Sequence, residues 1–435
     1  MTRRLFLSTI PAALAAGAPR PNVIWIWADN LAYGDLACYG NGAVKTPAID
    51  RLAAEGVRFS QFYVAHTVCS PSRAALLTGR QPFRTGIVDV LRPDSPVGLP
   101  ESEVTIAAAL GKAGYRTQAI GKWHLGDRRQ YLPTERGFDQ YFGLPYSMDM
   151  APTLLYRDQK IVENMEGARV ETYTRRLTDE AVRFLEGTAK RPFFLYFSHT
   201  LPHPPLNLPP DARSPGRPVY DDAIEHLDIE VGRLLEAVDR LGLRENTLVV
   251  FSSDNGPMHA GGKTGGFRGR IRDAYEGGLR VPFAARWPGR IPAGRVVDEP
   301  AIMYDVFPTL MKLCGGTVPQ DRTYDGQDIW PLLSGEGGVR REKPFVWVYT
   351  DNVTTVRDGR WKLHLAHRDK PLPEPELYDL ETDSGEARNV AGARVAELRR
   401  LKEIAVRAQA EVPKAWPLYY PVLDPKKLPS GPRRQ

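Results

Sequence analysis

Asn22-Val23-Ile24-Trp25-Ile26-Trp27 is the stretch of sequence that decides the fold. It is a run of β-branched and aromatic residues of strand length, without alternating polar positions. Such a run is typical of a central strand of a parallel sheet, which is buried on both faces. The run leads into Ala28-Asp29-Asn30, so two polar side chains directly follow a buried strand.

The same pattern recurs three more times along the chain. Apolar runs at 115–120, 193–197 and 248–251 lead into Gly121-Lys122-Trp123-His124, into Ser198-His199, and into Ser253-Asp254-Asn255-Gly256. Amphipathic stretches at 46–56, 104–114, 174–185 and 221–241 predict helices between the strands. Alternating strands and helices predict a doubly wound α/β sheet, in which ligands bind beyond the carboxyl ends of the strands.

A helix start that carries a cysteine lies at Cys69-Ser70-Pro71-Ser72-Arg73-Ala74-Ala75-Leu76-Leu77-Thr78-Gly79-Arg80. Pro71 suits the first turn of a helix, and Gly79 suits its end. Cys69 is then expected just before the first turn, where free N–H groups and the helix dipole favour negative charge. Two interpretations stay open on this local pattern: a small buried hydrophobe, or a tip that holds a thiolate, a sulfate or a phosphate.

Three motifs together carry a family resemblance. Cys69–Arg73 with Leu77–Arg80, Gly121–Gly126 and Phe142–Ser147 resemble type I sulfatases of the arylsulfatase A-like branch. The resemblance implies an alkaline-phosphatase-like α/β/α sandwich with a mixed, mostly parallel sheet, plus a small C-terminal antiparallel sheet with a helix. It also implies that a formylglycine-generating maturation enzyme oxidises Cys69 to Cα-formylglycine, an aldehyde whose hydrate is the nucleophile.

The predicted site residues divide into metal ligands and sulfate contacts. Together with the group derived from Cys69, four hard oxygen ligands suit Ca²⁺ or Mg²⁺: Asp29, Asn30, Asp254 and Asn255. The resemblance implies that Arg73 and Lys122 act in catalysis, that His203 protonates the leaving alcohol, and that His124 serves as base or orienting group. It places Ser147 on the sulfate, and Lys263 and Arg270 are further predicted substrate contacts.

Two positions depart from the family pattern. Asn30 stands where the family usually has a second Asp, so the predicted metal site has one negative charge fewer. Ile271 stands where this branch carries a lysine, and its side chain cannot donate a hydrogen bond. Lys263, Arg270 and Arg272 are the candidates to replace that lysine; the alternative is that His203 alone protonates the leaving group.

Composition and the N-terminal segment limit the classes of protein to which the chain can belong. The chain has 435 residues, 42% of them hydrophobic, with a formal net charge of +6 and three cysteines. That charge is diffuse and includes no Lys/Arg run, so we expect no nucleic-acid partner. Thr2-Arg3-Arg4-Leu5-Phe6-Leu7-Ser8 resembles a twin-arginine export signal, and the apolar run that overlaps it is too short to span a membrane.

We therefore expect a signal peptide over 1–18, a catalytic domain over 19–335, and a C-terminal subdomain with a tail over 336–435. The predicted protein is exported to the periplasm or beyond and is not an integral membrane protein. Its predicted function is hydrolysis of an organic sulfate ester, on a sulfated glycan or small molecule, to an alcohol and inorganic sulfate. The alternatives are a phosphonate or phosphate ester hydrolase of the same superfamily, and a catalytically silent anion- or carbohydrate-binding relative.

Overall fold

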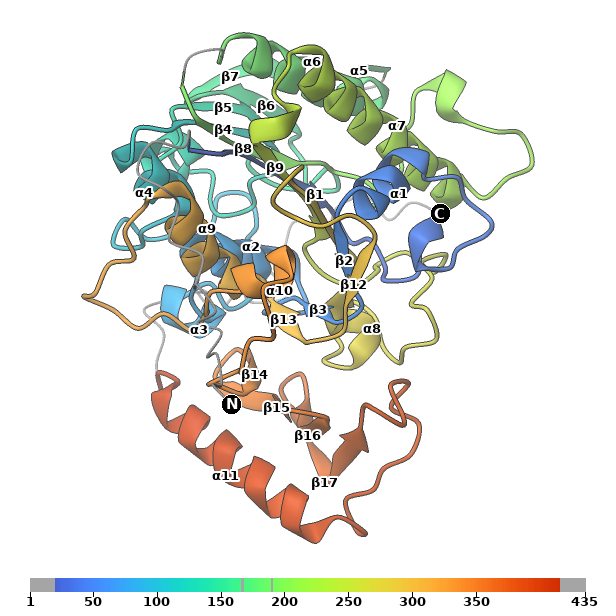
Figure 1. Ribbon diagram of the computed structural model, residues 1–435, viewed down its shortest axis with the longest axis vertical. Coiled ribbons are helices and arrows are strands. Elements are labelled where there is room, and N and C mark those ends of the chain that lie inside the picture. The colour runs from blue at the N-terminus through green and yellow to red at the C-terminus, as the bar shows by residue number, and fades with distance from the viewer. Residues whose placement is uncertain (1–19, 166–167, 189–190, 415–435) are drawn as a thin grey trace, which may run out of the picture.

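The computed structural model describes residues 20–165, 168–188 and 191–414. The predicted signal peptide and the tail from residue 415 lie outside the described residues. A ten-stranded sheet runs through the larger part of the molecule (Figure 1). In spatial order its strands are β12 (Arg295–Val297), β2 (Val57–Phe59), β11 (Phe283–Arg286), β9 (Thr247–Ser253), β1 (Asn22–Ala28), β8 (Phe193–Ser198), β4 (Arg116–Gly121), β5 (Gln140–Gly143), β6 (Leu154–Arg157) and β7 (Lys160–Asn164).

The four strands expected from the sequence are neighbours at the centre of this sheet. β9, β1, β8 and β4 lie side by side and all pair in parallel, with Trp27 opposite both Ser252 and Ser198. Their carboxyl ends therefore share one edge of the sheet. Antiparallel pairs join β11 to β9 and β5 to β6, so the sheet is mixed but mostly parallel at its centre.

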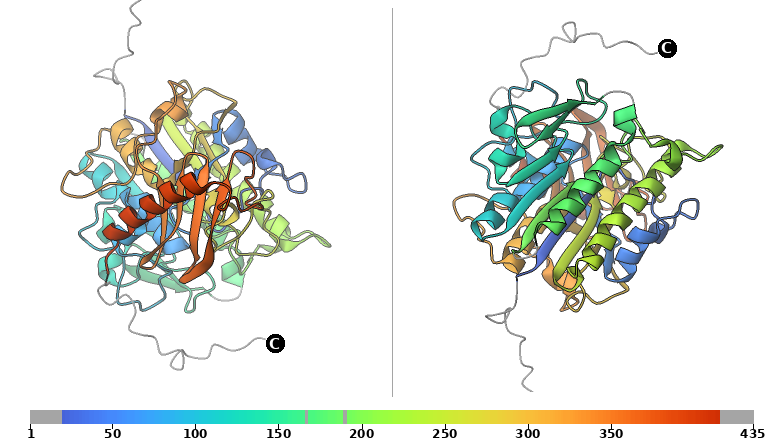
Figure 2. Two further views of the ribbon diagram at one scale, coloured as in Figure 1. Left: turned by 90° about the horizontal axis from the view of Figure 1, so that it is seen from below. Right: turned by 90° about the horizontal axis from the view of Figure 1, so that it is seen from above.

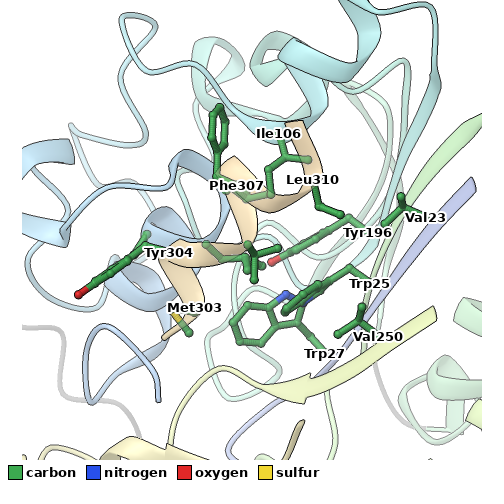
Figure 3. Packing of buried hydrophobic residues seen from close by; sticks show 14 of the residues in the cluster. Val23, Trp25, Trp27, Ile106, Tyr196, Val250, Met303, Tyr304, Phe307 and Leu310 are labelled. Carbon is green, nitrogen blue, oxygen red and sulfur yellow. The ribbon is translucent and has the colours of Figure 1, made fainter. Parts of the chain in front are cut away.

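The side chains of β1 alternate between two hydrophobic cores. Trp25 and Trp27 belong to one cluster, in which they pack with Phe307 and Leu310 of the helix α9 (Val306–Cys314) (Figure 3). Ile24 and Ile26 belong to the other, which includes the apolar faces of the long helices. Burial on both faces explains why the strand is apolar throughout.

Helices cover both faces of the sheet. One face carries α1 (Pro47–Ala54), α6 (Tyr173–Glu186) and α7 (Val219–Arg240), the last two lying side by side (Figure 2). The other carries α2 (Cys69–Thr78), α4 (Ile106–Lys112) and α9. The predicted α/β/α sandwich is confirmed, and the four predicted helices end within three residues of the expected bounds. Shorter helices are α3 (Pro82–Thr85), α5 (Ala168–Glu171), α8 (Glu276–Leu279) and α10 (Trp330–Ser334).

Helix α2 is the helix predicted from the cysteine stretch, and all ten of its residues are buried. Gly79 follows it with a φ of 70°, the left-handed conformation that glycine adopts without strain. One detail differs from the prediction: Val68 is the N-cap, so Cys69 is the first residue of the helix instead of the residue before it. The side chain of Cys69 still lies at the helix tip.

Two smaller sheets complete the fold. A three-stranded sheet consists of β10 (Arg280–Val281), β3 (Phe62–Tyr63) and β13 (Ala301–Ile302). The predicted C-terminal antiparallel sheet is confirmed, with α11 (Val395–Glu411) packed across it (Figure 2). Its strands are β14 (Phe345–Tyr349), β15 (Asn352–Asp358), β16 (Trp361–His367) and β17 (Lys370–Asp379). No helix of the described residues is both long and apolar enough to cross a membrane.

A buried ionic network ties the C-terminal sheet to α8. The Glu276 carboxylate accepts hydrogen bonds from Lys362 Nζ at 2.8 Å and from Tyr63 Oη at 2.6 Å. Lys362 Nζ also lies 3.1 Å from Glu386 Oε1, which lies 2.7 Å from His364 Nε2. Glu386 in turn accepts a hydrogen bond from the backbone N–H of Glu276 at 2.6 Å. Every charged group in this network, hereafter the Glu276 network, has an opposite charge beside it.

Candidate active site

The carboxyl edge of the central strands gathers three of the predicted site residues around Cys69. Asp29 follows β1, Lys122 follows β4, and Cys69 enters from the tip of α2. The Cys69 Sγ atom lies 3.5 Å from Lys122 Nζ, 3.6 Å from Asn30 Oδ1 and 3.7 Å from Asp29 Oδ1. All four side chains are buried. We call this group, together with Arg73, Asp254 and Asn255, the Cys69 cluster.

Arg73 holds the cluster together from one turn further along α2. Its Nε and Nη2 atoms both donate to Asp254 Oδ2, at 3.0 and 2.7 Å, and its Nη1 atom donates to the Lys122 carbonyl at 2.9 Å. Lys122 Nζ donates to Asp29 Oδ2 at 2.7 Å. Two carboxylates and two fixed cations therefore share one buried site, an arrangement that pairs every charge.

Asn30 and Asn255 complete the oxygen ligands at this edge. Asn30 has a φ of 64°, which asparagine tolerates better than most residues, and its Oδ1 accepts a hydrogen bond from Asn255 Nδ2 at 2.6 Å. Asn255 Oδ1 is buried and has no hydrogen-bond partner among the described residues. Asp29, Cys69 and Asp254 each offer a ligand atom within 4.8 Å of the others. These hard oxygen donors, one of them unsatisfied, fit Ca²⁺ or Mg²⁺.

Burial and the two cations set the protonation of this cluster. Burial raises the pKa of Asp29, but Lys122, His203 and Arg73 together outweigh it and hold that pKa below its ordinary range. Burial and the neighbouring Asp29 charge raise the pKa of Asp254. Burial, and then Asp254, raise the pKa of the Cys69 thiol well above its ordinary value. The thiolate interpretation of the helix tip is thus disfavoured: an unmodified Cys69 is a protonated thiol and a poor nucleophile.

His124 lies next to Lys122 with its ring held in one tautomer. Its Nε2 atom lies 2.9 Å from the carbonyl oxygen of Leu91, which can only accept, so Nε2 carries the proton. Burial, and then the charges of Lys122 and Arg73, lower the pKa of His124 well below its ordinary value. His124 is therefore neutral, and its Nδ1 lone pair has no partner in the described parts of the chain.

His203 and Ser147 reach the same region from two loops. The backbone N–H of Asp29 donates to the Leu201 carbonyl at 2.9 Å, which ties the loop of His203 to the end of β1. His203 Nδ1 donates to the Pro204 carbonyl, which leaves Nε2 for other partners. The Ser147 hydroxyl is buried, without a hydrogen-bond partner among the described residues, and the loop that carries it is hydrogen-bonded to the His124 backbone through Pro145.

The three candidates to replace the missing lysine all have other partners. Lys263 Nζ donates to Asn41 Oδ1 at 2.7 Å, and Arg270 Nη1 donates to the His259 carbonyl at 2.9 Å. Arg272 Nη1 lies 3.4 Å from Asp89 and from the Tyr349 hydroxyl. The structure gives none of the three a hydrogen bond to the Cys69 cluster among the residues it describes. Their assignment to the substrate stays a prediction.

The sequence did not single out some groups that hold this site. The Ser198 hydroxyl accepts from Arg73, and the Ser253 hydroxyl accepts from the Leu31 backbone at 2.9 Å. Both serines lie in the polar segments that follow predicted strands, and they end the observed strands β8 and β9, so their position is a signal that could have assigned them to the site. The Leu91 carbonyl that orients His124 is a backbone group of a loop, and no residue type in the sequence points to it.

The carboxyl edge of a doubly wound sheet is where ligands bind, and the two fixed cations of this centre suit an anionic ligand. Comparison with known proteins narrows the class. The sulfatase family model matches residues 21–316, and a model described as N-sulphoglucosamine sulphohydrolase, C-terminal, matches 262–409.

Individual relatives agree with the family models. Human arylsulfatase A is 39% identical over 92% of this chain and 90% of its own length. N-acetylgalactosamine-6-sulfatase of Canis lupus familiaris is 38% identical over 83% of this chain and 75% of its own. The crystal structure of Ps i-CgsB in complex with k-i-k-neocarrahexaose superposes with a TM-score of 0.81 at 30% identity, covering 91% of this chain and 94% of that one. The chain belongs to the sulfatase family, and it is a sulfuric ester hydrolase.

Proposed function

We propose that this enzyme removes sulfate from a sulfated carbohydrate, with residue 69 in its oxidised form. The observation that carries the proposal is the position of Cys69 Sγ, which lies within 3.7 Å of a carboxylate, an amide oxygen and an ammonium group. As a protonated thiol, Cys69 makes only weak hydrogen bonds with these neighbours. A small polar group at the same position, such as a hydrated aldehyde, matches them.

A divalent cation and an oxidised residue 69 would complete the site. Asp29, Asn30, Asp254 and Asn255 would hold a Ca²⁺ or Mg²⁺ ion, which neutralises charge on the sulfate oxygens, and Cα-formylglycine at position 69 supplies a hydroxyl nucleophile when hydrated. The two carboxylates balance the cation. Arg73 and Lys122 remain as fixed positive charges for the sulfate ester.

The two histidines suit opposite proton transfers. His124 is neutral and its Nδ1 lone pair has no partner among the described residues, which is the state that a base needs, and its lowered pKa makes it a weak base. His203 donates through Nδ1 to a backbone carbonyl, so its Nε2 atom is the one that can carry a proton to the leaving alcohol. We assign His124 as base and His203 as acid, and Ser147 as a hydrogen-bond donor to the sulfate.

The test is sulfate release by protein co-expressed with a maturation enzyme, with and without Ca²⁺, using sugar sulfates, 4-nitrophenyl sulfate and a phenylphosphonate monoester. We expect Ca²⁺-dependent release of inorganic sulfate from at least one sugar sulfate, and none from the Cys69→Ala variant. Faster turnover of the phosphonate than of every sulfate would contradict the proposal, as would full activity of Cys69→Ala.

We also propose that the protein is exported, on the resemblance of residues 1–18 to a twin-arginine signal. Fractionation of cells that express the full chain tests this. We expect enzyme outside the cytoplasm, and its retention in the cytoplasm when Arg3 and Arg4 are both changed to lysine. Equal distribution of both forms would contradict export by this route.

A further inference from the structure

The ring of His124 is oriented by a backbone group of another loop. His124 has a φ of 61°, and its backbone N–H donates to the Pro145 carbonyl at 2.9 Å, so its main chain is fixed. Its ring makes one hydrogen bond among the described residues, from Nε2 to the Leu91 carbonyl at 2.9 Å, and Nδ1 has no partner there. The tautomer of this histidine therefore depends on where the Leu91 carbonyl lies.

Leu91 lies between α3 and α4, in a segment without regular secondary structure at residues 86–105. Its backbone is held by α2, because its N–H donates to the Ser70 hydroxyl oxygen at 3.1 Å. The N–H and the carbonyl of one residue are joined through a single Cα, so an anchor on the first restricts where the second can lie. The hydroxyl of Ser70 is thus linked to the ring of His124 through the backbone of Leu91.

Burial makes this link costly to lose. Ser70 is 0% exposed, His124 is 1% exposed and Leu91 is 2% exposed, so bulk water does not reach them. Buried backbone N–H groups are almost always hydrogen-bonded. Without the Ser70 hydroxyl, the Leu91 N–H is left without that partner, and the segment has to shift to give it another.

The ion pair nearest to Leu91 is too long and too exposed to fix its backbone. Asp89 Oδ1 lies 3.4 Å from Arg272 Nη1, and the two side chains are 28% and 34% exposed, so the pair contributes little. The Leu91 side chain packs in the hydrophobic core, which holds the residue near α2 but does not direct its carbonyl. That direction depends on the hydrogen bond to Ser70.

Helix α2 does not itself need the Ser70 hydroxyl. Val68, not Ser70, is the N-cap of this helix, and alanine is a better helix former than serine. What serine adds at this position is an oxygen that accepts the Leu91 N–H.

We propose that Ser70 is a positioning residue for the reaction: through the Leu91 backbone it keeps the proton of His124 on Nε2, so that the Nδ1 lone pair stays free to accept a proton. This inference rests on the proposed function, because it takes His124 as the base. It assigns to the residue next to Cys69 a role that is separate from the nucleophile, the cation and the sulfate contacts.

The experiment compares Ser70→Ala with Ser72→Ala, its matched control on the same helix. Ser72 is also 0% exposed, and its hydroxyl donates to the His66 carbonyl at 2.7 Å, so the control loses a serine hydrogen bond to a different backbone group. Both serines lie close to Cys69 in the sequence, so peptide mass spectrometry measures the aldehyde content, and kcat is expressed per converted site. The substrate is whichever of 4-nitrophenyl sulfate and the sugar sulfates wild type hydrolyses fastest.

Ser70→Ala should lower kcat by about tenfold, as expected for one neutral hydrogen bond, and leave KM within about threefold of wild type. KM should change little because the substrate does not contact Ser70 in this proposal. Ser72→Ala should keep kcat within about threefold of wild type, with a similar change in melting temperature. Ser70→Thr retains the oxygen and should restore kcat. Where Ser70→Ala does not fold, Ser70→Val compared with the isosteric Ser70→Thr makes the same test.

NMR spectroscopy of nitrogen-labelled histidine measures the tautomer without turnover. The chain has eight histidines, and the His124→Gln variant assigns the signals of this one. Wild type and Ser72→Ala should show a neutral ring with its proton on Nε2 alone. Ser70→Ala should show a mixture of the two neutral tautomers, a change that a merely structural role of the hydroxyl would not produce.

The outcomes separate the positioning role from the proposed function. Unchanged histidine signals in Ser70→Ala, a kcat equal to that of wild type, or equal losses of kcat in both alanine variants would overturn the role of Ser70 while wild type still releases sulfate. Wild type that releases sulfate from no substrate would overturn the proposed function, and the NMR comparison would still decide whether Ser70 orients His124.

Discussion

Two buried charge clusters of this enzyme, similar in composition, differ in whether their polar atoms are satisfied. The Glu276 network has two carboxylates, a lysine and a histidine, and none of these side chains has a buried atom without a hydrogen-bond partner within the described residues. The Cys69 cluster has two carboxylates, a lysine and an arginine, yet Asn30 Nδ2 and Asn255 Oδ1 have no hydrogen-bond partner in the part of the chain that the structure describes.

The difference separates a structural role from a functional one. A closed network gains nothing from a ligand, and it fixes the C-terminal sheet against α8. The Cys69 cluster, at the carboxyl edge of the central strands, has polar atoms without partners among the described residues. A cation and a sulfate ester would bind to these atoms. Substitutions in the first should change stability, and substitutions in the second should change activity.

The largest effect is expected from Cys69→Ala. Loss of the nucleophile should lower kcat/KM for sulfate release by about 10³-fold or more. The melting temperature should change little, because Cys69 contributes no charge to the ion pairs around it. Sulfate release and thermal unfolding, measured on the same preparation, test the expected loss of activity and the expected unchanged stability. A variant that fails to fold would show that Cys69 has a structural role.

Glu276→Gln should have the opposite profile. It leaves Arg280 buried without its carboxylate partner and leaves Lys362 with Glu386 alone, and breaking such a buried pair costs about 3–5 kcal/mol in the free energy of unfolding. The kcat/KM of the remaining folded enzyme should stay close to wild type. Denaturant unfolding and activity corrected for folded fraction provide the measurement.

The change of the free energy of unfolding at acid pH gives a further test of this prediction. Burial raises the pKa of Glu276, but Lys362, Arg357 and Arg280 outweigh it and lower that pKa to about 2, from 4.5. The ionised carboxylate therefore stabilises the folded state fully above pH 4.5, and this contribution is lost as the pH falls toward 2. The stability difference between wild type and Glu276→Gln should shrink over that range; a constant difference would contradict the ionic account.

Ca²⁺ should stabilise the folded enzyme only by binding to the Cys69 cluster. At a Ca²⁺ concentration of 100 times Kd, wild type should gain about 2.7 kcal/mol in the free energy of unfolding. Glu276→Gln should gain the same amount, because the two clusters share no residue, whereas Asp254→Asn should gain little. Calorimetry with and without chelator measures the gain. An equal gain in Asp254→Asn would place the cation elsewhere.

The smallest effect is expected at the departure from the family pattern. Asn30→Asp adds a negative charge beside Asp29, so it should tighten Ca²⁺ binding by about tenfold, the equivalent of 1.4 kcal/mol. Without the cation the same charge should destabilise the protein. Isothermal titration with Ca²⁺ compares the two forms; weaker binding by Asn30→Asp would show that position 30 does not face the metal.

The sequence was sufficient to predict the positions of the Cys69 cluster because strand ends determine them. Four apolar runs predicted four buried strands with polar residues at their carboxyl ends, and the structure places these strands side by side, so those residues meet at one edge. Asp29, Lys122 and Asp254 could therefore be placed without coordinates. Cys69 was placed by the helix pattern of α2, to within one residue.

Loop geometry and electrostatics could not be predicted in the same way. The direction of the Lys263 side chain depends on Asn41, which lies far away in the sequence, and the tautomer of His124 depends on one backbone carbonyl. The raised pKa of Cys69 results from the sum of burial and four neighbouring charges, two of each sign. Neither the side-chain direction, nor the tautomer, nor the pKa follows from residue types and spacing.

The most direct test of the central claim is mass spectrometry of the peptide that contains Cys69, from protein co-expressed with a maturation enzyme, with sulfate release assayed on the same sample. We predict the mass loss of a thiol-to-aldehyde conversion together with Ca²⁺-dependent sulfate release. An unmodified thiol together with full sulfatase activity would contradict the claim that residue 69 acts in its oxidised form.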